Sequence, residues 1–592
     1  MAQQRQWQLL LNRPLEGGGS HIVDDDFFLS PVGRRDPSAE LQATLLALSK
    51  PVSELDPDSH ARCRFPARHL WLLSALELPS THRPDARCRA LQRWVDLDDI
   101  KSLQVILVSG YFGNPASAFG HSLIRVATHT NASSGGLTDL GINFGALVPP
   151  NENPLLYIYR GITGRYVAGF TEREFLEHDR VYSRTENRDF WTYDLKLTQA
   201  QQWLVVSHMW ELVGRRFTYY FFSQNCAWRM AELLELALPQ SLRRKGGDPW
   251  YIPVELVQRF STHPDLLERL GPVQFEPSAA RLLHAQIAAL SDDERAEFER
   301  VIDQQTELNS ALQRLSAEPA KKRLLEAVLA WAAWKDPAGS QHAQAEGKAL
   351  KNQALLARLG MSVGSPKVIP TAVPSPAAGT APMRWGLGVA TGGREVSRAS
   401  LTWAPVHMEA GGFNALEGGE FKMAELALSW ADAQRPRQEH LTAISVLRIP
   451  LSARSLPGEQ EWVWAIRLGA HRRVGAASEG EAHEPSLRSA VELGWGKGLR
   501  WGSHATAYGL AQLEASGQQV QVLPRLGLML NLTPKWHLTA DWRPACRIAT
   551  AQGGCSKLEV LWRSADQQVL RWGVTAGGGQ GPRAYLGLDW YQ

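Results

Sequence analysis

Two stretches of the chain contain residues that could form a thiol-based active site. Residues 113–126 (GNPASAFGHSLIRV) form a turn-rich loop that ends at His121 and continues as an apolar strand. Residues 221–231 (FFSQNCAWRMA) form an aromatic, strand-like run that becomes a helix at Cys226. A thiol attacks as its thiolate, and both a neighbouring imidazole and a helix N-terminus lower its pKa. We therefore predict that Cys226 is a nucleophile and that His121 is its general base.

A third polar group is needed to orient the imidazole of such a pair. Asn143 lies in LGINFGALV, which we expect to be the next strand, so its side chain would share a face with that of His121. Asp139 and Asn151 are the alternatives to Asn143. The backbone amide of Cys226, at the start of its helix, could help to hold an oxyanion.

Simpler explanations exist for each of these residues. A histidine after glycine is often a turn residue, and a cysteine at a helix start is often a small buried hydrophobe. Ser117 or Ser223 could be the nucleophile instead, but neither stands in a GxSxG elbow. The 17 histidines form no HExxH motif and the cysteines form no CxxC pair, so we predict no zinc, no other metal and no cofactor.

The substrate is expected to lie between the two stretches, against polar and aromatic side chains that flank them. The glycine-rich segment 161–170 (GITGRYVAGF) would shape the cleft. The predicted substrate-binding residues are Asn114, Ser117, Phe119, Tyr159, Arg160 and Asn225.

The five cysteines divide by position. Cys63 and Cys88 bracket a short helical segment, and Cys546 and Cys555 bracket the short loop CRIATAQGGC. Both pairs are spaced for local disulfides, which would indicate an oxidising compartment. Cys226 is then left over, and an odd cysteine in an exported protein is a candidate reactive thiol. The alternative is that all five cysteines are free and buried.

Length and charge narrow the class of protein. At 592 residues the chain exceeds one ordinary core, so roughly two to four domains are expected. The net charge of +3 does not favour a polyanion, so we predict no nucleic-acid partner. The N-terminus lacks the basic-then-apolar pattern of a secretory signal. The chain is therefore either cytosolic or begins near its mature start, and the cysteine pairs favour the second.

The pattern of helices and strands changes along the chain. Ser38 and Thr198 are expected to cap helices, and SDDERAEFERVI has the serine cap and acidic first turn of another helix. The expected domains are a helical N-terminal domain (1–100), an α+β domain (101–270), a helical connector (271–365), a Pro/Ala-rich linker (366–382) and an antiparallel β-barrel (383–592).

The C-terminal part contains about a dozen short alternating runs separated by turn residues, with Trp and Tyr recurring near their ends. Eleven of them are MRWGLGVAT, AELALSWADA, LTAISVLRIPL, WVWAIRLGAH, SAVELGWGKGL, HATAYGLAQLEA, VQVLPRLGLMLNL, WHLTADWRPA, LEVLWRSA, VLRWGVTAGG and AYLGLDWYQ. This pattern favours an outer-membrane barrel, and a soluble barrel or sandwich is the alternative. Many of the runs carry Arg or Glu, which must face the lumen if the wall lies in lipid.

The motifs GNPASAFGHSLIRV, DFWTYDL and FFSQNCAW resemble the family named Lnb N-terminal periplasmic domain, which occurs in envelope proteins of Gram-negative bacteria. The flanking helical region and the β-rich end resemble the usual neighbours of that domain. The order of His before Cys is also similar to the permuted papain-like thiol hydrolases, the NlpC-type and lecithin:retinol acyltransferase-like group. That resemblance implies a permuted papain-like fold, with Cys226 as nucleophile, His121 as base and Asn143 as orienting residue.

These observations together favour a cell-envelope cysteine hydrolase or acyltransferase. Its target would be an amide or ester bond of a lipid or a peptidoglycan peptide, and it would reside in the outer membrane with a periplasmic domain. A non-catalytic outer-membrane or periplasmic binding or assembly factor is the alternative. A soluble periplasmic β-module is a third hypothesis. The sequence indicates no particular protein partner.

Overall fold

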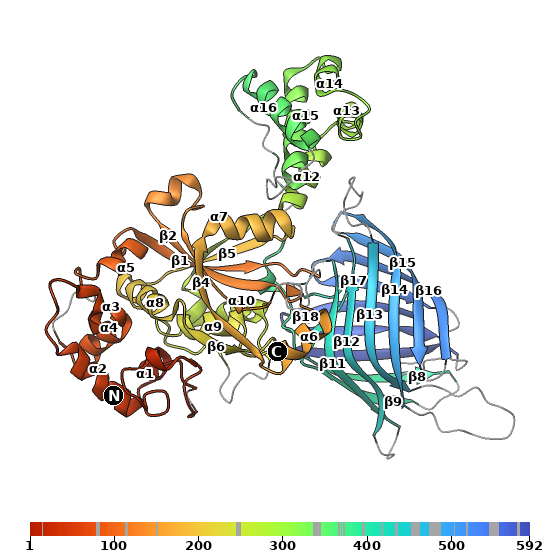
Figure 1. The fold of residues 1–592 in the computed structure, drawn as a ribbon. Helices are drawn as coiled ribbons and strands as arrows, with labels where there is room; N and C mark the ends of the chain where they lie inside the picture. The colour runs from red at the N-terminus through yellow and green to blue at the C-terminus, as the bar shows by residue number, and fades with distance from the viewer. Residues whose placement is uncertain are drawn as a thin grey trace. The chain divides into compact units, whose positions relative to one another are not determined.

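The computed structural model divides into two compact units, residues 1–375 and 376–592 (Figure 1). Each unit is described by itself. The structure describes the chain apart from residues 15, 79–82, 113–116, 150–151, 244–249, 336–344, 365–367, 369, 371–372, 394–396, 415, 417, 432–435, 451–461, 473–486, 503, 517–518, 544–555 and 577–580.

The first hundred residues are mainly helical, as predicted. Asp36 caps the second helix, because its carboxylate accepts the backbone N–H groups of Ser38 and Ala39. The predicted cap at Ser38 was therefore wrong: Pro37 occupies the first helical position, one residue after the cap. The α-helices of this described region are α1 (Arg5–Leu10), α2 (Pro37–Leu48), α3 (Ala61–Arg64), α4 (Pro66–Ala75) and α5 (Arg89–Trp94).

A disulfide joins Cys63 to Cys88, as predicted, and ties α3 to the start of α5. Cys546 and Cys555 lie outside the described residues. Among the described cysteines, Cys226 is the free one, and it is buried.

Seven antiparallel strands form the sheet of the middle domain, in the order β6-β4-β3-β2-β1-β5-β7. Helices α8 (Gln199–Leu212) and α9 (Cys226–Leu234) pack against its central strands. Thr198 and Gln201 form the capping box of α8, which confirms the predicted cap. The strands are β1 (Ile100–Val108), β2 (His121–Thr128), β3 (Leu140–Ala146), β4 (Tyr166–Glu174), β5 (Phe190–Leu195), β6 (Arg216–Tyr219) and β7 (Leu270–Glu276).

The helical N-terminal region is anchored to this domain through a buried polar contact. The Glu211 carboxylate on α8 accepts the backbone N–H groups of Ala67 and Arg68 in the first turn of α4. The fully buried Arg68 guanidinium also pairs with Glu40 at 2.6 Å. Buried charges persist when they are paired in this way, so α4 and α8 hold a fixed position beneath the sheet.

Strand β7 lies in a segment that the sequence predicted to be helical. It pairs with β5, so the sheet continues to Glu276. Helices follow it, and Ser291 and Glu294 form the capping box of one of them. These helices are α12 (Ala279–Ala288), α13 (Asp292–Ile302), α14 (Leu308–Arg314), α15 (Glu318–Lys335) and α16 (Ala345–Leu359). Within the described ranges, no helix is both long enough and apolar enough to span a membrane.

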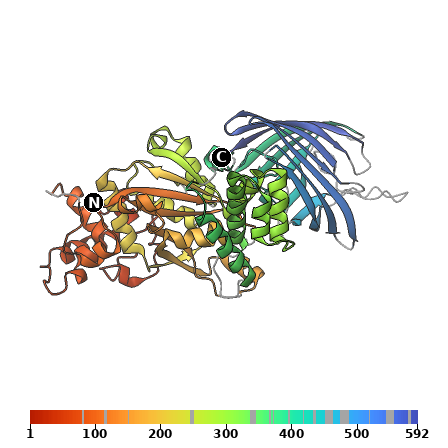
Figure 2. The same ribbon diagram turned by 90° about the horizontal axis from the view of Figure 1, so that it is seen from above.

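The second unit is a closed antiparallel barrel, with twelve strands in its described residues (Figures 1 and 2). The ring closes because β9 pairs with β11 and β8 pairs with β20, and the short β10 (Val406–Met408) adds to β11. The twelve are β8 (Arg384–Gly392), β9 (Arg398–Ala404), β11 (Gly419–Trp430), β12 (Arg437–Arg448), β13 (Trp462–Arg472), β14 (Leu487–Trp501), β15 (Ala505–Ser516), β16 (Gln519–Thr533), β17 (Trp536–Trp542), β18 (Ser556–Ala565), β19 (Gln568–Ala576) and β20 (Arg583–Tyr591).

The side chains of the barrel wall alternate between an apolar outer face and a charged lumen. On β14, Val491 and Leu493 are 42% and 44% exposed, whereas Glu492 between them is 3% exposed. The charged residues of the strands thus face inward, as a wall in lipid requires. Large apolar side chains exposed on the outside include Trp385, Leu387, Val389, Ile466, Leu468, Leu558, Val574 and Leu586.

Candidate active site

His121 is the first residue of β2, and Gly120 fixes how the chain enters that strand. Gly120 has a φ of +93°, and a Cβ there would lie 2.7 Å from the carbonyl oxygen of Val108. Only glycine adopts this conformation at low cost. Val108 is the last residue of β1 and is also the register partner of His121. The imidazole is therefore held at the end of the central strand pair.

Cys226 is the first residue of α9, and Asn225 caps that helix. The Asn225 side chain accepts the N–H of Trp228 at 3.2 Å and donates to the carbonyl oxygens of Phe221 and Tyr251 at 2.9 and 2.6 Å. The hydrogen bonds of Asn225 thus fix the turn that presents the cysteine. Helix α9 packs on β2 and β3, which carry the histidine and the asparagine.

The Cys226 thiol is 4% exposed, and this burial raises its pKa to about 11. Hydrogen bonds from the backbone amides of Ser122 and Ala227 lower the pKa in opposition to burial. One of these amides belongs to the residue after His121, and the other belongs to the first turn of α9. The sulfur therefore sits between the start of β2 and the start of α9, in a pocket of N–H groups that favours negative charge.

Nε2 of His121 donates a hydrogen bond to Oδ1 of Asn143, at 2.5 Å. A carbonyl oxygen only accepts, so this contact places the proton on Nε2 and leaves the lone pair on Nδ1. Burial, and next the Arg188 guanidinium, lower the pKa of His121 to about 3. The imidazole is therefore neutral at physiological pH, and its unprotonated Nδ1 can accept a proton.

Asp139, one of the two alternative orienting residues, makes other contacts in the structure. The Asp139 carboxylate accepts from the backbone and hydroxyl of Thr128 and from the Asn131 side chain. Asn151 lies outside the described residues. The thiol of Cys226 and the imidazole of His121 are both described, and no hydrogen bond joins them in this state. Such catalytic contacts often form only when substrate binds.

Sequence reasoning missed three residues beside the pair. The Tyr182 ring lies 5.5 Å from that of His121 and is stacked on His178 with 6.0 Å between ring centroids. The Arg188 guanidinium carbon lies 5.0 Å from the centroid of the same Tyr182 ring. Tyr182 stands in η5 (Asp179–Thr185), a π-helical segment, and such segments are frequent at functional sites. No motif marks these residues, because tertiary packing brings them to the site: His178 lies against Gly141 of β3, and Arg188 precedes β5, which pairs with β1.

The predicted substrate-binding residues are spread over several environments. Phe119 is buried with its ring 5.8 Å from that of Phe222, and the Ser117 carbonyl accepts two backbone N–H groups in the turn before His121. On α6 (Pro154–Ile162), Tyr159 is exposed and Arg160 pairs with Glu152. Asn114 lies outside the described residues. In the described residues no three or more His, Cys, Asp or Glu side chains group in a way that could hold a metal ion.

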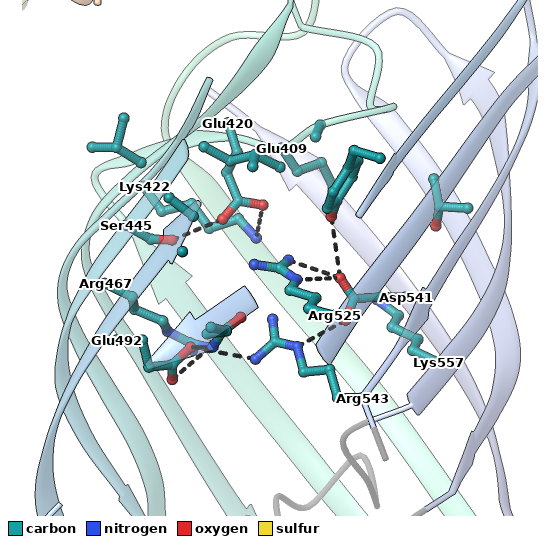
Figure 3. Close-up of a pocket in the computed structure, with 18 of the residues that line it drawn as sticks. Glu409, Glu420, Lys422, Ser445, Arg467, Glu492, Arg525, Asp541, Arg543 and Lys557 are labelled. Carbon is teal, nitrogen blue, oxygen red and sulfur yellow. Dashed lines mark hydrogen bonds and ion pairs between the residues drawn. The ribbon is translucent and has the colours of Figure 1, made fainter. Parts of the chain in front are cut away.

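A cavity of about 250 Å³ lies in the barrel lumen (Figure 3). Its charged side chains point toward one another and pair across the strands. Asp541 accepts from Arg525 at 2.7 Å and from Arg543 at 2.8 Å, and Arg543 also lies 3.4 Å from Glu492. The lumen at this level is therefore crossed by ion pairs.

Comparison with known families gives two matches. Residues 90–261 match the family described as Lnb N-terminal periplasmic domain, and residues 1–75 match a family described only as a domain of unknown function. No curated protein matches the chain. The first match contains β1 to β6 and α9, so it includes His121, Asn143 and Cys226.

Solved structures similar to the chain include two porins and an outer membrane channel. A KdgM porin in complex with disordered oligogalacturonate has 4% identity and a TM-score of 0.22, covering 36% of this chain and 98% of the porin. The NanC porin has 8% identity and a TM-score of 0.20, and the match covers 36% of this chain and 100% of the porin. An outer membrane channel from Pseudomonas putida F1 has 11% identity and a TM-score of 0.22, and the match covers 38% of this chain and 100% of the channel.

TM-scores this low add no argument to the strand pairing, which by itself establishes the closed barrel. The wall has an apolar exterior and a charged interior, which is the pattern of a transmembrane barrel. The chain thus fits a cell-envelope protein: residues 90–261 match the Lnb N-terminal periplasmic domain family, and the C-terminal unit is an outer-membrane-type β-barrel.

Proposed function

We propose that the periplasmic domain is a thiol-dependent hydrolase or acyltransferase, with Cys226 as nucleophile, His121 as base and Asn143 as the orienting residue. The observation that carries the proposal is the hydrogen bond from His121 Nε2 to Asn143 Oδ1, beside a cysteine that begins a helix. A free cysteine alone, or a histidine alone, would not support it. Cys226 is the only unpaired thiol among the described residues, and it can act as a nucleophile. The nearby imidazole is held by one nitrogen, and its other nitrogen is free to act as the base.

The reaction follows from the protonation states. Nδ1 of His121 takes the thiol proton as the sulfur attacks the carbonyl carbon, and the carbonyl electron pair moves to oxygen. In this proposal, backbone N–H groups at the start of α9 stabilise that oxyanion. Collapse expels the alcohol or amine, which receives the proton from the imidazolium, and leaves a thioester on Cys226. Water or an acceptor hydroxyl or amine then attacks the thioester and restores the thiol.

The resting site differs from a preformed thiolate–imidazolium pair. Burial raises the pKa of Cys226 and lowers that of His121, so both groups are neutral at pH 7. Proton transfer must therefore accompany attack, as general-base catalysis allows. Water is kept from the thiol until a substrate reaches it, and this exclusion strengthens the amide and imidazole contacts that follow.

The substrate class is proposed from location. The domain is periplasmic and its chain carries an outer-membrane-type barrel, so acyl lipids and peptidoglycan peptides are the amides and esters within reach. Lipid and muropeptide profiles of a Cys226→Ala strain should differ from wild type in one of these classes. Ser207→Ala is the matched control, because Ser207 is a small, fully buried polar residue on α8 outside the site. The control strain should match wild type.

The burial of the thiol favours a second candidate, a non-catalytic binding or assembly factor of the envelope. Site-resolved labelling with iodoacetamide separates the two. The enzyme proposal expects Cys226 labelling to slow when His121 is replaced by Ala. If Cys226 reacts no faster than a model thiol at neutral pH, and His121→Ala changes nothing, the non-catalytic role is the better account.

A further inference from the structure

The strand register brings Arg188 to the same end of the sheet as His121. Val108, the last residue of β1, pairs with His121 on one side and with Phe190 of β5 on the other. Arg188 precedes Phe190 by two residues, so it lies just beyond β5, at the end of the sheet where β2 begins. Nε of Arg188 donates to the carbonyl oxygen of Ser109, at 2.7 Å, just beyond β1.

The Arg188 side chain is almost fully buried, with 1% of its surface exposed. Its Nη1 pairs with Glu186 at 2.8 Å, and its guanidinium carbon lies 5.0 Å from the Tyr182 ring centroid. Its Nη2, however, is buried and has no hydrogen-bond partner. A buried unpaired N–H group costs on the order of 1–3 kcal/mol, and more when it carries charge. Other buried arginine nitrogens of the chain also have no partner, but Arg188 is the one that lies beside the proposed catalytic residues.

The charge of Arg188 acts on the proposed site. Burial is the largest influence on both groups: it lowers the pKa of His121 and raises that of Cys226. Arg188 lowers both pKa values, so it adds to burial at His121 and opposes burial at Cys226. The Tyr182 ring contacts both partners, since it lies 5.5 Å from the His121 ring and beneath the Arg188 guanidinium. Arg188 therefore lies close to both of the proposed catalytic side chains.

We propose that Nη2 of Arg188 binds an anionic group of the substrate, a carboxylate or a phosphate, next to the carbonyl that Cys226 attacks. The proposal rests on the proposed thiol site and names its specificity. Guanidinium groups bind both anions with strong, charge-assisted hydrogen bonds. Nη1, the other terminal nitrogen of Arg188, donates to the Glu186 carboxylate, and this bond helps to fix the guanidinium plane. The ligand would then accept the hydrogen bond that Nη2 can donate.

Two alkylating probes of nearly equal size test this directly on the full-length protein in detergent. Iodoacetate carries a carboxylate and iodoacetamide does not, and both transfer a two-carbon group to the thiol with loss of iodide. We expect the iodoacetate-to-iodoacetamide rate ratio at Cys226, resolved by peptide mass spectrometry, to exceed that of N-acetylcysteine about tenfold, the effect of one favourable charged contact. Arg188→Gln should abolish the excess, and Arg188→Lys should keep part of it.

Arg184→Gln is the matched control, because Arg184 stands on η5 but is exposed and pairs with Asp179. Its ratio should equal that of wild type. Acetate and methyl phosphate are then compared as protectants of wild-type Cys226 against iodoacetamide, a measurement that needs no variant. Stronger protection by acetate indicates a carboxylate, and stronger protection by methyl phosphate indicates a phosphate.

The proposal is overturned if the wild-type ratio equals that of N-acetylcysteine and neither anion protects, or if Cys226 reacts with neither probe. It is also overturned if Arg184→Gln lowers the ratio as much as Arg188→Gln. A failure of the thiol chemistry is distinguishable: His121→Ala would then leave both rates unchanged, while the preference for the anionic probe and its loss in Arg188→Gln would persist.

Discussion

The side chains of His121 and Asn143 are joined across neighbouring strands by a hydrogen bond of 2.5 Å from Nε2 to Oδ1. The bond is diagonal: Ile142 pairs with Ile124, so the same register continued by one residue sets Asn143 beside Leu123, two residues further along β2 than His121. Positions two apart on a strand share a face, so the bond requires no distortion of the sheet. It fixes both the plane and the tautomer of the imidazole.

Replacing Asn143 by Ala should therefore slow reactions of Cys226 without unfolding the sheet. The neutral imidazole would be free to adopt the tautomer with its proton on Nδ1, which cannot act as a base towards the thiol. General-base contributions amount to about 10²–10⁴-fold, so we expect at least a ~10-fold loss in the iodoacetamide labelling rate. Asn143→Asp keeps an oxygen acceptor and should retain most of the rate. Equal rates in all three proteins would contradict the orienting role.

The pH dependence of Cys226 labelling follows from the protonation states of the pair. Burial raises the pKa of the thiol to about 11 and lowers that of His121 to about 3. We expect the labelling rate to rise from pH 7 to pH 10 without a plateau. A plateau between pH 5 and pH 8 would instead show a thiolate–imidazolium pair. In terms of stability, the buried thiol's contribution is full below the unfolded value of about 8.5 and is lost as the pH approaches 11.

Local patterns predicted most of the structure because they are set by neighbouring residues. Alternation identified eleven of the twelve barrel strands, and only β9 was missed, since Pro405 separates its short run from β10. The same alternation implied that Arg and Glu face the lumen. Strand β7 was missed because its pairing with β5 joins residues about eighty positions apart, and no local periodicity reports such a contact.

In the candidate site, too, local patterns predicted some residues, whereas others depend on contacts between distant parts of the chain. His121 and Cys226 could be found from their loop and helix start, and Asn143 from the expected neighbouring strand. Tyr182 and Arg188 could not, because their proximity depends on β5 pairing with the far side of β1. The neutral state of the thiol was also unforeseen. A helix N-terminus and an imidazole suggested a lowered pKa, whereas burial raises the pKa of the thiol more than the neighbouring backbone amides and Arg188 lower it.

Loss of the Cys63–Cys88 disulfide should loosen the N-terminal helices. The bond closes a loop with a sequence separation of 25. It lowers the entropy of the unfolded chain and thereby raises the free energy of unfolding by about 3 kcal/mol. The Cys63→Ser/Cys88→Ser double variant should lose that stability and become sensitive to limited proteolysis before β1. Cleavage patterns of oxidised and variant protein provide the measurement. Unchanged protection would mean that the contacts of α4 with α8 hold the region without the disulfide.

Arg571 should be critical to the barrel interior. Its guanidinium contacts Asp589, Glu409 and Glu559, and all of these side chains are largely buried. Arg571→Met would leave three carboxylates without their shared partner, at a cost of about 3–5 kcal/mol. Heat-modified mobility in gel electrophoresis should show unfolding at a lower temperature. Arg563→Met is the control, since the Arg563 guanidinium contacts the carbonyl and the exposed carboxylate of Asp566 near a strand end. A similar shift in both variants would argue against a special role of the lumen cluster.

Adjacent residues of β14 test which face of the wall meets lipid. Leu493 faces outward and Glu492 faces the lumen. An outward charge in mid-bilayer costs about 2–4 kcal/mol, whereas a lumen-facing substitution is not exposed to lipid. Leu493→Arg should therefore reduce the fraction that folds into lipid vesicles, measured by protease protection, while Leu493→Phe should not. If Leu493→Arg folds into vesicles as well as wild type does, the outer face of β14 does not contact the hydrocarbon core, and the apolar exterior would need another partner.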